Sequence, residues 1–115
     1  MTGSATTTLA RPQWAKELER FTERNAGRMT TLEIDDSDLG AQEILTWQLR
    51  GMSYDHANDE VEIMFGGFVD PGQHMTHVIR GVIEIDLLTS SKGLDEALRV
   101  ATAKGQTLLR LSTHE

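Results

Sequence analysis

The sequence predicts a single α+β domain, in which an N-terminal helix packs on an antiparallel, meander-like sheet of five to seven short strands. The sheet is expected to be open or curled into a small half-barrel. Three observations predict this class. An amphipathic helical pattern lies near the N-terminus, alternating apolar and polar residues follow it, and short polar clusters separate the alternating runs. Alternating runs joined by short polar turns are typical of hairpins.

The predicted helix begins near Pro12, which suits a first helical turn because a missing N–H is harmless there. Trp14, Leu18 and Phe21 follow at spacings of four and three residues and form an apolar stripe, while charged residues fill the opposite face. The segment "RNAGR" ends the helix, and Gly27 is the expected left-handed cap. This helix should therefore cover one face of the sheet.

Four alternating segments predict most of the strands: "RMTTLEID" (28–35), "ILTWQLRGMSYD" (44–55), "EVEIMF" (60–65) and "HMTHVIRGVIEIDLL" (74–88). The clusters "DDSDLG" and "DHAND" are typical of turns, and Gly51 interrupts the second run where a β-bulge would fit.

The segment 94–104 is compatible with two structures. Leu94, Ala97, Leu98 and Ala101 have helical spacing, which predicts a helix. The same region also divides into "LRVAT", "AKG" and "QTLLRL", which is the pattern of strand, turn and strand. Local rules leave both alternatives open.

The expected core combines the helical stripe with the apolar positions of the strands. It contains Trp14, Leu18, Phe21, Leu32, Ile34, Trp47, Leu49, Val61, Ile63, Phe65, Ile85, Leu109 and Leu111.

Length and composition exclude several classes of protein. The 115 residues correspond to one domain, expected over 9–115 after a small, polar, flexible tail over 1–8. The chain has no cysteine, which excludes disulfides, zinc–thiolate sites and thiol catalysis. Its net charge of −7 disfavours a nucleic-acid partner. With no apolar run of membrane-spanning length and no signal peptide, we expect no membrane association and a cytoplasmic location.

Asp70, His74 and His77 are the candidate metal ligands, because they lie within eight positions beside a Pro-Gly turn. On a strand, however, residues three apart point to opposite faces. Since "HVIRGVIEI" favours an extended chain, we expect the two histidine rings to diverge at a loop-to-strand junction and to hold no metal. No other cofactor is expected either, since Gly66–Gly67 lacks the lysine or third glycine of phosphate-binding loops.

Two further acidic clusters could carry chemistry. "DDSDLG" lacks the ligand register of a calcium-binding EF-hand loop, and Asx-turns explain it better. Asp55, His56, Asp59 and Glu60 crowd one predicted hairpin turn, where an acid/base pair is conceivable, but exposed turn carboxylates are usually only solvated.

Several motifs follow one another in a characteristic order. Leu9, Trp14 and Gly27 come first, followed by "LGAQ" at 39–42, "LRGMSYDHANDEVEI" at 49–63, "HMTH" at 74–77 and "LRVATAKGQTLLRL" at 98–111. In this order they resemble a family of small bacterial proteins catalogued only as a domain of unknown function. The resemblance spans nearly the whole chain and implies no assigned activity. It implies that the closing segment is a hairpin, with strands at 97–103 and 106–112.

Two hypotheses about function follow. The first is a non-enzymatic protein-binding or self-associating module, because no catalytic constellation is apparent and small sheet domains leave edge strands that invite pairing. The alternative is a small hydrolase, or a ligand- or metal-binding domain, that uses Asp70, His74 and His77. A cleft around these residues would favour the alternative, and a flat surface would favour the module.

Overall fold

The computed structural model describes residues 4–38, 40–66 and 74–112, the side chains of 43–46 excepted. Its elements are β1 (Ala5–Thr8), a 3-10 turn (Arg11–Gln13), α1 (Trp14–Asn25), β2 (Met29–Asp36), β3 (Gly40–Asp55), β4 (Glu60–Gly66), β5 (His74–Arg80), β6 (Val82–Thr89), β7 (Asp95–Thr102) and β8 (Gly105–Leu111). The predicted α+β class, with one helix on an antiparallel sheet, is confirmed. No helix in the described part of the chain is long and apolar enough to cross a membrane.

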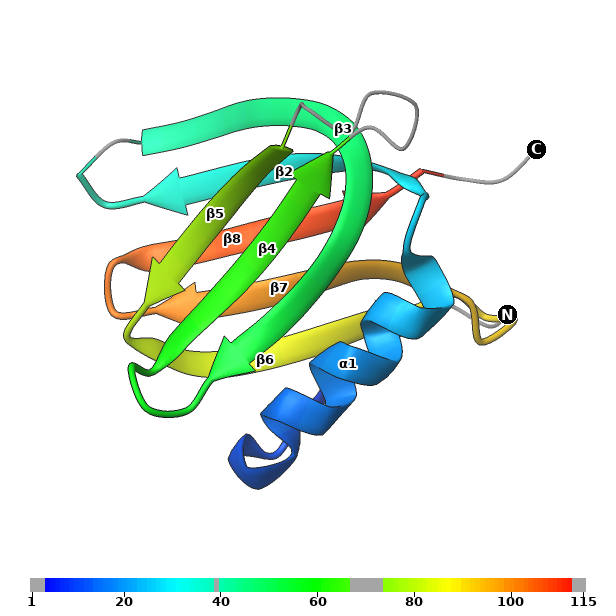
Figure 1. Cartoon of the computed structure of the whole chain (residues 1–115), viewed down its shortest axis with the longest axis horizontal. Helices are drawn as coiled ribbons and strands as arrows, with labels where there is room; N and C mark the ends of the chain where they lie inside the picture. The colour runs from blue at the N-terminus through cyan, green and yellow to red at the C-terminus, as the bar shows by residue number, and fades with distance from the viewer. Residues whose placement is uncertain (1–3, 39, 67–73, 113–115) are drawn as a thin grey trace.

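The strands form one sheet in the order β1-β6-β7-β8-β2-β3-β4-β5, and every paired neighbour is antiparallel. Two consecutive meanders, β2 to β5 and β6 to β8, are joined where the C-terminal strand β8 pairs with β2. The long strand β3 bends, so that β4 and β5 cross over the layer of β6, β7, β8 and β2 (Figure 1). Inward side chains of both layers form one hydrophobic cluster, as in a half-barrel.

The bend in β3 coincides with the predicted bulge. The pairing of β3 with β4 shifts register between Leu49 and Gly51. Thr22 of α1 docks there: its Oγ1 accepts a hydrogen bond from the Met52 N–H at 2.8 Å. A Cβ at Gly51 would lie 3.2 Å from the Thr22 methyl carbon, so a larger residue would press against the helix. The glycine thus permits the close approach of helix and strand.

The helix ends as the sequence predicts. Its last residue is Asn25, and Gly27 follows with φ 93°, the left-handed conformation expected of a cap. The amide of Gly27 donates to the Leu49 carbonyl at 2.8 Å, which ties the end of the helix to β3.

The core agrees with the expected set at all but two positions, because Ile34 and Trp47 are only partly buried. The set omitted several residues that are buried, among them Met52, Ile79, Val82, Leu98 and Val100. Most of these lie on β5, β6 and β7, where apolar residues are so frequent that alternation alone does not identify the inward face.

Two expectations about element boundaries meet a clear outcome. The segment 94–104 is not helical: β7 and β8 are strands, as the family resemblance implies. The flexible tail predicted for 1–8 is wrong from Ala5 onward, because Ala5–Thr8 form β1 and pair with β6. This added strand raises the sheet from the seven strands at the upper end of the prediction to eight.

Candidate functional site

Strand β5 carries both predicted histidines and places them on opposite faces of the sheet. His74 is exposed at the start of the strand, whereas His77 is half-buried on the core side, opposite Ile63. Burial lowers the pKa of His77, which favours its neutral form. The expected divergence of the two side chains is confirmed, and it leaves them without a common ligand position. Asp70, the third candidate, lies outside the described residues.

No group of three or more histidine, aspartate or glutamate side chains converges within the described ranges. A metal site of the usual kind needs at least three protein ligands around one point. The candidate ligands His74 and His77 therefore provide no such centre from the described part of the chain.

In the turn between β3 and β4, the acidic side chains accept hydrogen bonds from the backbone of the turn and from neighbouring side chains. The carboxylate of Asp55 accepts hydrogen bonds from the Ala57 amide and from Asn58, and the Asn58 side chain at 2.7 Å is the main cause that lowers the pKa of Asp55. Asp59, at φ 53°, accepts a hydrogen bond from the Tyr54 hydroxyl at 2.8 Å. This bond raises the pKa of Tyr54.

The remaining members of this turn also have contacts within the chain. Arg11 lies 3.4 Å from Asp59, and Glu60 pairs with Arg80 on β5. His56 contacts the edge of the Tyr54 ring. The carboxylates of this hairpin turn therefore bind groups of the same chain, and these contacts stabilise the turn.

The edge of β5 that faces away from β4, its free side, is more distinctive than the two histidines or the acidic turn. Within the described residues β5 pairs only with β4, and the sheet order places it at one edge. Its seven residues pair without a register shift, and between His74 and Arg80 it contains neither a permanent charge nor a proline. Edge strands normally carry charges, prolines or bulges that prevent pairing with another chain. The opposite edge, β1, has only four residues.

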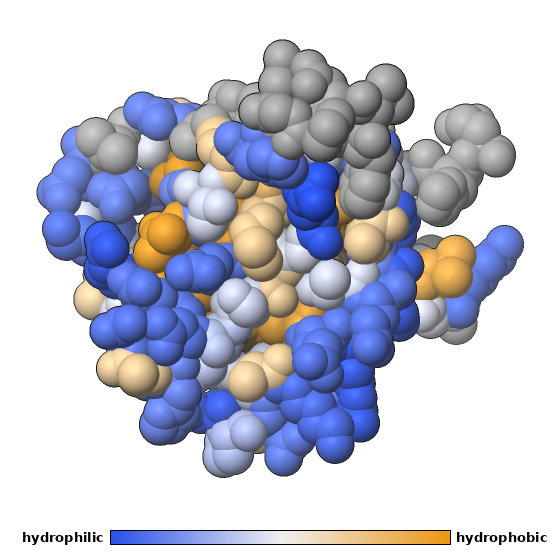
Figure 2. All heavy atoms as spheres, in the orientation of Figure 1, coloured by the Kyte–Doolittle hydropathy of each residue, from blue (hydrophilic) through white to orange (hydrophobic). Residues whose placement is uncertain are grey.

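The outward surface beside this edge is weakly polar except at Glu62. Pairing places Met64 beside Thr76, and Ser53 and Val78 on either side of Glu62. Val78 is 36% exposed. Figure 2 shows pale and orange surface, with some hydrophilic atoms among it, over the middle of this face, within a mostly hydrophilic border. We call Ser53, Met64, Thr76 and Val78, together with the free side of β5, the β5 edge surface.

By sequence, His74 and His77 were candidate metal ligands, whereas in the structure the strand that carries them, His74–Arg80, is an edge strand. The uncharged run "HMTHVI" was the available signal, but its position at the edge depends on which strands pair.

Comparisons with other proteins place the chain in a family. Neither the curated proteins nor the solved structures gave a match. The family model described as "Family of unknown function (DUF5335)" matches residues 5–114. This span covers the helix and all eight strands, so the chain belongs to that family of unknown function.

Proposed function

We propose that this protein is a non-enzymatic, cytoplasmic protein-binding module that associates through the β5 edge surface, with a second copy of the chain as the occupant. One observation carries the proposal: β5 is a regular seven-residue edge strand with no permanent charge between His74 and Arg80. Addition of a strand would satisfy the outward N–H and C=O groups of β5.

A second copy suits this edge for two reasons. Antiparallel pairing of β5 with itself is compatible with a two-fold axis, the commonest symmetry of soluble oligomers. It would also place the uncharged residues of β5, Met75 to Ile79, of the two copies beside one another, so that no permanent charge lies along the paired strands between His74 and Arg80. The net charge of −7 on each chain opposes association. Added salt should therefore strengthen it, because salt screens this repulsion.

The alternative function, a hydrolase or metal-binding domain built on Asp70, His74 and His77, finds no comparable support. His74 and His77 lie on opposite faces. We therefore do not propose it.

The experiment is size-exclusion chromatography with light scattering over a range of protein and salt concentrations. We expect a species of twice the 12.8 kDa chain mass that becomes more abundant as either concentration rises. Val78→Lys should abolish that species, since lysine on an edge strand prevents edge pairing. The matched control is Ile83→Lys, which places the same charge on β6 at another exposed β-branched residue, 61% exposed. A strict monomer at all concentrations would overturn the proposal, as would equal disruption by both variants.

A further inference from the structure

A second surface lies where the end of α1, the turn between β6 and β7, and the end of β8 meet. It is a groove of about 820 Å³. None of its lining residues belongs to β5, so it is separate from the β5 edge surface. The side chains that matter here are Arg24, Arg28, Lys92, Leu94, Asp95 and Arg110. We call it the Arg28 groove.

The charge of the Arg28 groove is opposite to that of the whole protein. Four cationic side chains line it, against the carboxylates of Asp95 and Glu96 and that of Glu33, which pairs with Arg110 at 2.6 Å, so that a net charge of +1 remains. The chain as a whole carries −7. A local positive patch of this kind attracts anionic groups in spite of the overall charge.

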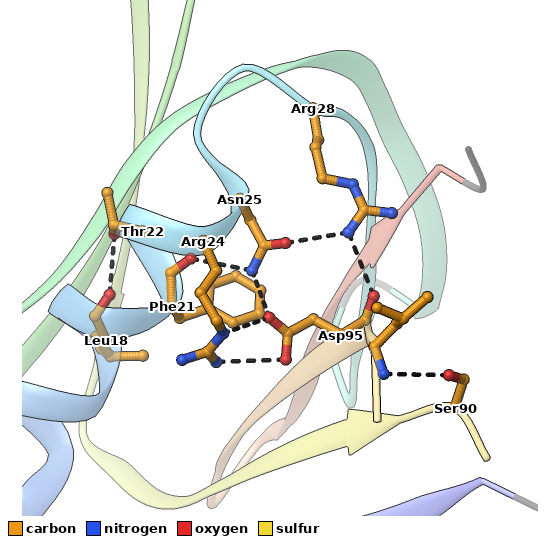
Figure 3. A network of polar contacts seen from close by, with 9 residues as sticks. Leu18, Phe21, Thr22, Arg24, Asn25, Arg28, Ser90 and Asp95 are labelled. Carbon is orange, nitrogen blue, oxygen red and sulfur yellow. Dashed lines mark hydrogen bonds and ion pairs between the residues drawn. The ribbon is translucent and has the colours of Figure 1, made fainter. Parts of the chain in front are cut away.

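The carboxylate of Asp95 does not neutralise the other cations of the groove, because neighbouring side chains already form an ion pair and a hydrogen bond with it. Arg24 binds it through Nε at 2.7 Å and Nη2 at 3.3 Å, and the side-chain amide of Asn25 donates to it at 2.8 Å (Figure 3). Its side chain is only 7% exposed. Asp95 therefore neutralises Arg24 and fixes the end of α1 to β7.

Arg28, by contrast, has only neutral acceptors among the described residues. Its Nη1 donates to the Asn25 side-chain oxygen at 3.0 Å and to the Asp95 carbonyl at 3.3 Å (Figure 3). Its Nη2 donates to the Ser112 carbonyl. Its Nε is buried and has no hydrogen-bond partner in the described part of the chain. The guanidinium is thus held in place, and no carboxylate of the described residues forms an ion pair with it.

The turn between β6 and β7 adds an exposed cation and an exposed apolar group. The Ser90 amide donates to the Leu94 carbonyl at 2.8 Å, and the Ser90 hydroxyl oxygen accepts from the amides of Lys92 and Leu94. These bonds order the turn that carries Lys92 and Leu94, and Leu94 is 64% exposed. Apolar side chains complete the lining: Leu88, Ala97, Leu108 and Leu111.

From this arrangement we infer that the Arg28 groove binds an acidic peptide segment of another protein, in which carboxylates alternate with apolar residues. The carboxylates would meet Arg28 and Lys92, while the apolar residues would contact Leu94 and the leucines of the lining. A peptide suits the site because Arg28 and Lys92 come from two separate connecting segments of the groove and the lining between them is apolar. Such charge complementarity contributes to specificity and to the association rate.

The probe is a fluorescein-labelled short peptide in which glutamate alternates with valine, titrated with the full chain and followed by fluorescence anisotropy. We expect saturable binding that is lost when glutamine replaces each glutamate. Lys92→Glu should weaken the affinity by about tenfold or more, because it replaces an attractive charge with a repulsive one. Lys104→Glu is the matched control, since it makes the same charge change in another exposed turn, outside the groove. Leu94→Ser should also weaken binding.

Three outcomes would overturn the inference: no binding of the glutamate peptide, equal binding of the glutamine peptide, or equal loss of affinity in Lys92→Glu and Lys104→Glu. The Val78→Lys variant separates this inference from self-association. It should bind the peptide with the parent affinity, and a loss of binding there would place the peptide on β5 and contradict the Arg28 groove.

Discussion

The two halves of the sheet differ in how the side chains on their outer faces are paired. On the outer face of β6, β7, β8 and β2, polar side chains pair within the chain: Asp86 accepts from Thr8 and Arg99, Arg99 also contacts Glu84 and Gln106, and Arg110 pairs with Glu33. The outer face of β4 and β5 instead presents Met64, Thr76 and Val78 beside Glu62, and the Glu60–Arg80 ion pair lies at the end of β5. We call these the paired half and the neutral half, the latter for the uncharged residues of β5 between His74 and Arg80.

This difference indicates which of the two outer faces has more of its polar groups paired within a single copy of the chain. In the paired half each strand has neighbours on both sides or, in the case of β1, a short free edge, and Asp86, Arg99 and Arg110 have partners in the chain. In the neutral half the sheet ends in a longer strand with few charges. A regular strand edge with few charges and no pairing partner is the kind of surface that proteins bury in contacts with other molecules.

The largest effect is expected from Trp14, because this residue connects the two halves. Its ring is buried, its Nε1 donates to the Leu9 carbonyl at 3.1 Å, and its ring contacts Tyr54 of β3 edge-on at 5.2 Å. Leu9 in turn donates to Ile85 of β6. Trp14→Ala should lower the free energy of unfolding by about 3–5 kcal/mol. Chemical denaturation measures this, with the exposed Glu19→Ala as the control. A variant as stable as the parent would contradict the docking of α1.

A smaller effect is expected when the side-chain contacts of Asp86 in the paired half are removed. This side chain is 8% exposed and contacts Arg99 at 2.6 Å and the Thr8 hydroxyl at 2.6 Å. Asp86→Ala should lower the free energy of unfolding by about 2–3 kcal/mol, which is less than for a fully buried pair, because Arg99 keeps its contacts with Glu84 and Gln106. Chemical denaturation measures this loss.

In the neutral half, Val78→Thr should change the free energy of unfolding by less than about 0.5 kcal/mol. Equal losses in the two variants would remove the distinction between the halves.

The pH dependence of stability gives a smaller test of the neutral half. Burial lowers the pKa of His77 in the folded protein, so below pH of about 6.5 the unfolded chain binds a proton that the folded chain does not. Stability should therefore fall as the pH drops through that value and toward the lower folded pKa. His77→Gln should reduce this slope in denaturation curves between about pH 7 and 5. The exposed His74→Gln is the control, and an identical slope in parent and His77→Gln would contradict the inward position of His77.

The smallest effect is expected from zinc. Because His74 and His77 lie on opposite faces of β5, one ion cannot bind both, and zinc should change the melting temperature little. Thermal melts with and without zinc measure this. A clear rise that disappears in the His74→Ala, His77→Ala double variant would make the metal-site hypothesis the better one.

Much of the local structure could be predicted from the sequence, because it depends on residues near one another in the chain. The spacing of Trp14, Leu18 and Phe21 predicts the helix, and Gly27 predicts its end. Asx-turn residues mark the hairpins correctly: the Asp36 carboxylate accepts from the Asp38 amide at 2.7 Å. The opposite orientation of His74 and His77 also follows from the two-residue period of a strand.

Other features depend on contacts that only the tertiary structure decided. Ala5–Thr8 have no apolar pattern of their own, and they form a strand because β6 offers an edge 78 or more positions away. The helical spacing of 94–104 is overridden because Leu98 and Val100 pair with β6 and β8 and enter the core. The neighbours of Arg28 and the free edge of β5 arise in the same way. Sequence periodicity describes each segment, whereas hydrogen-bond pairing between distant strands determines which segments meet and which edge remains open.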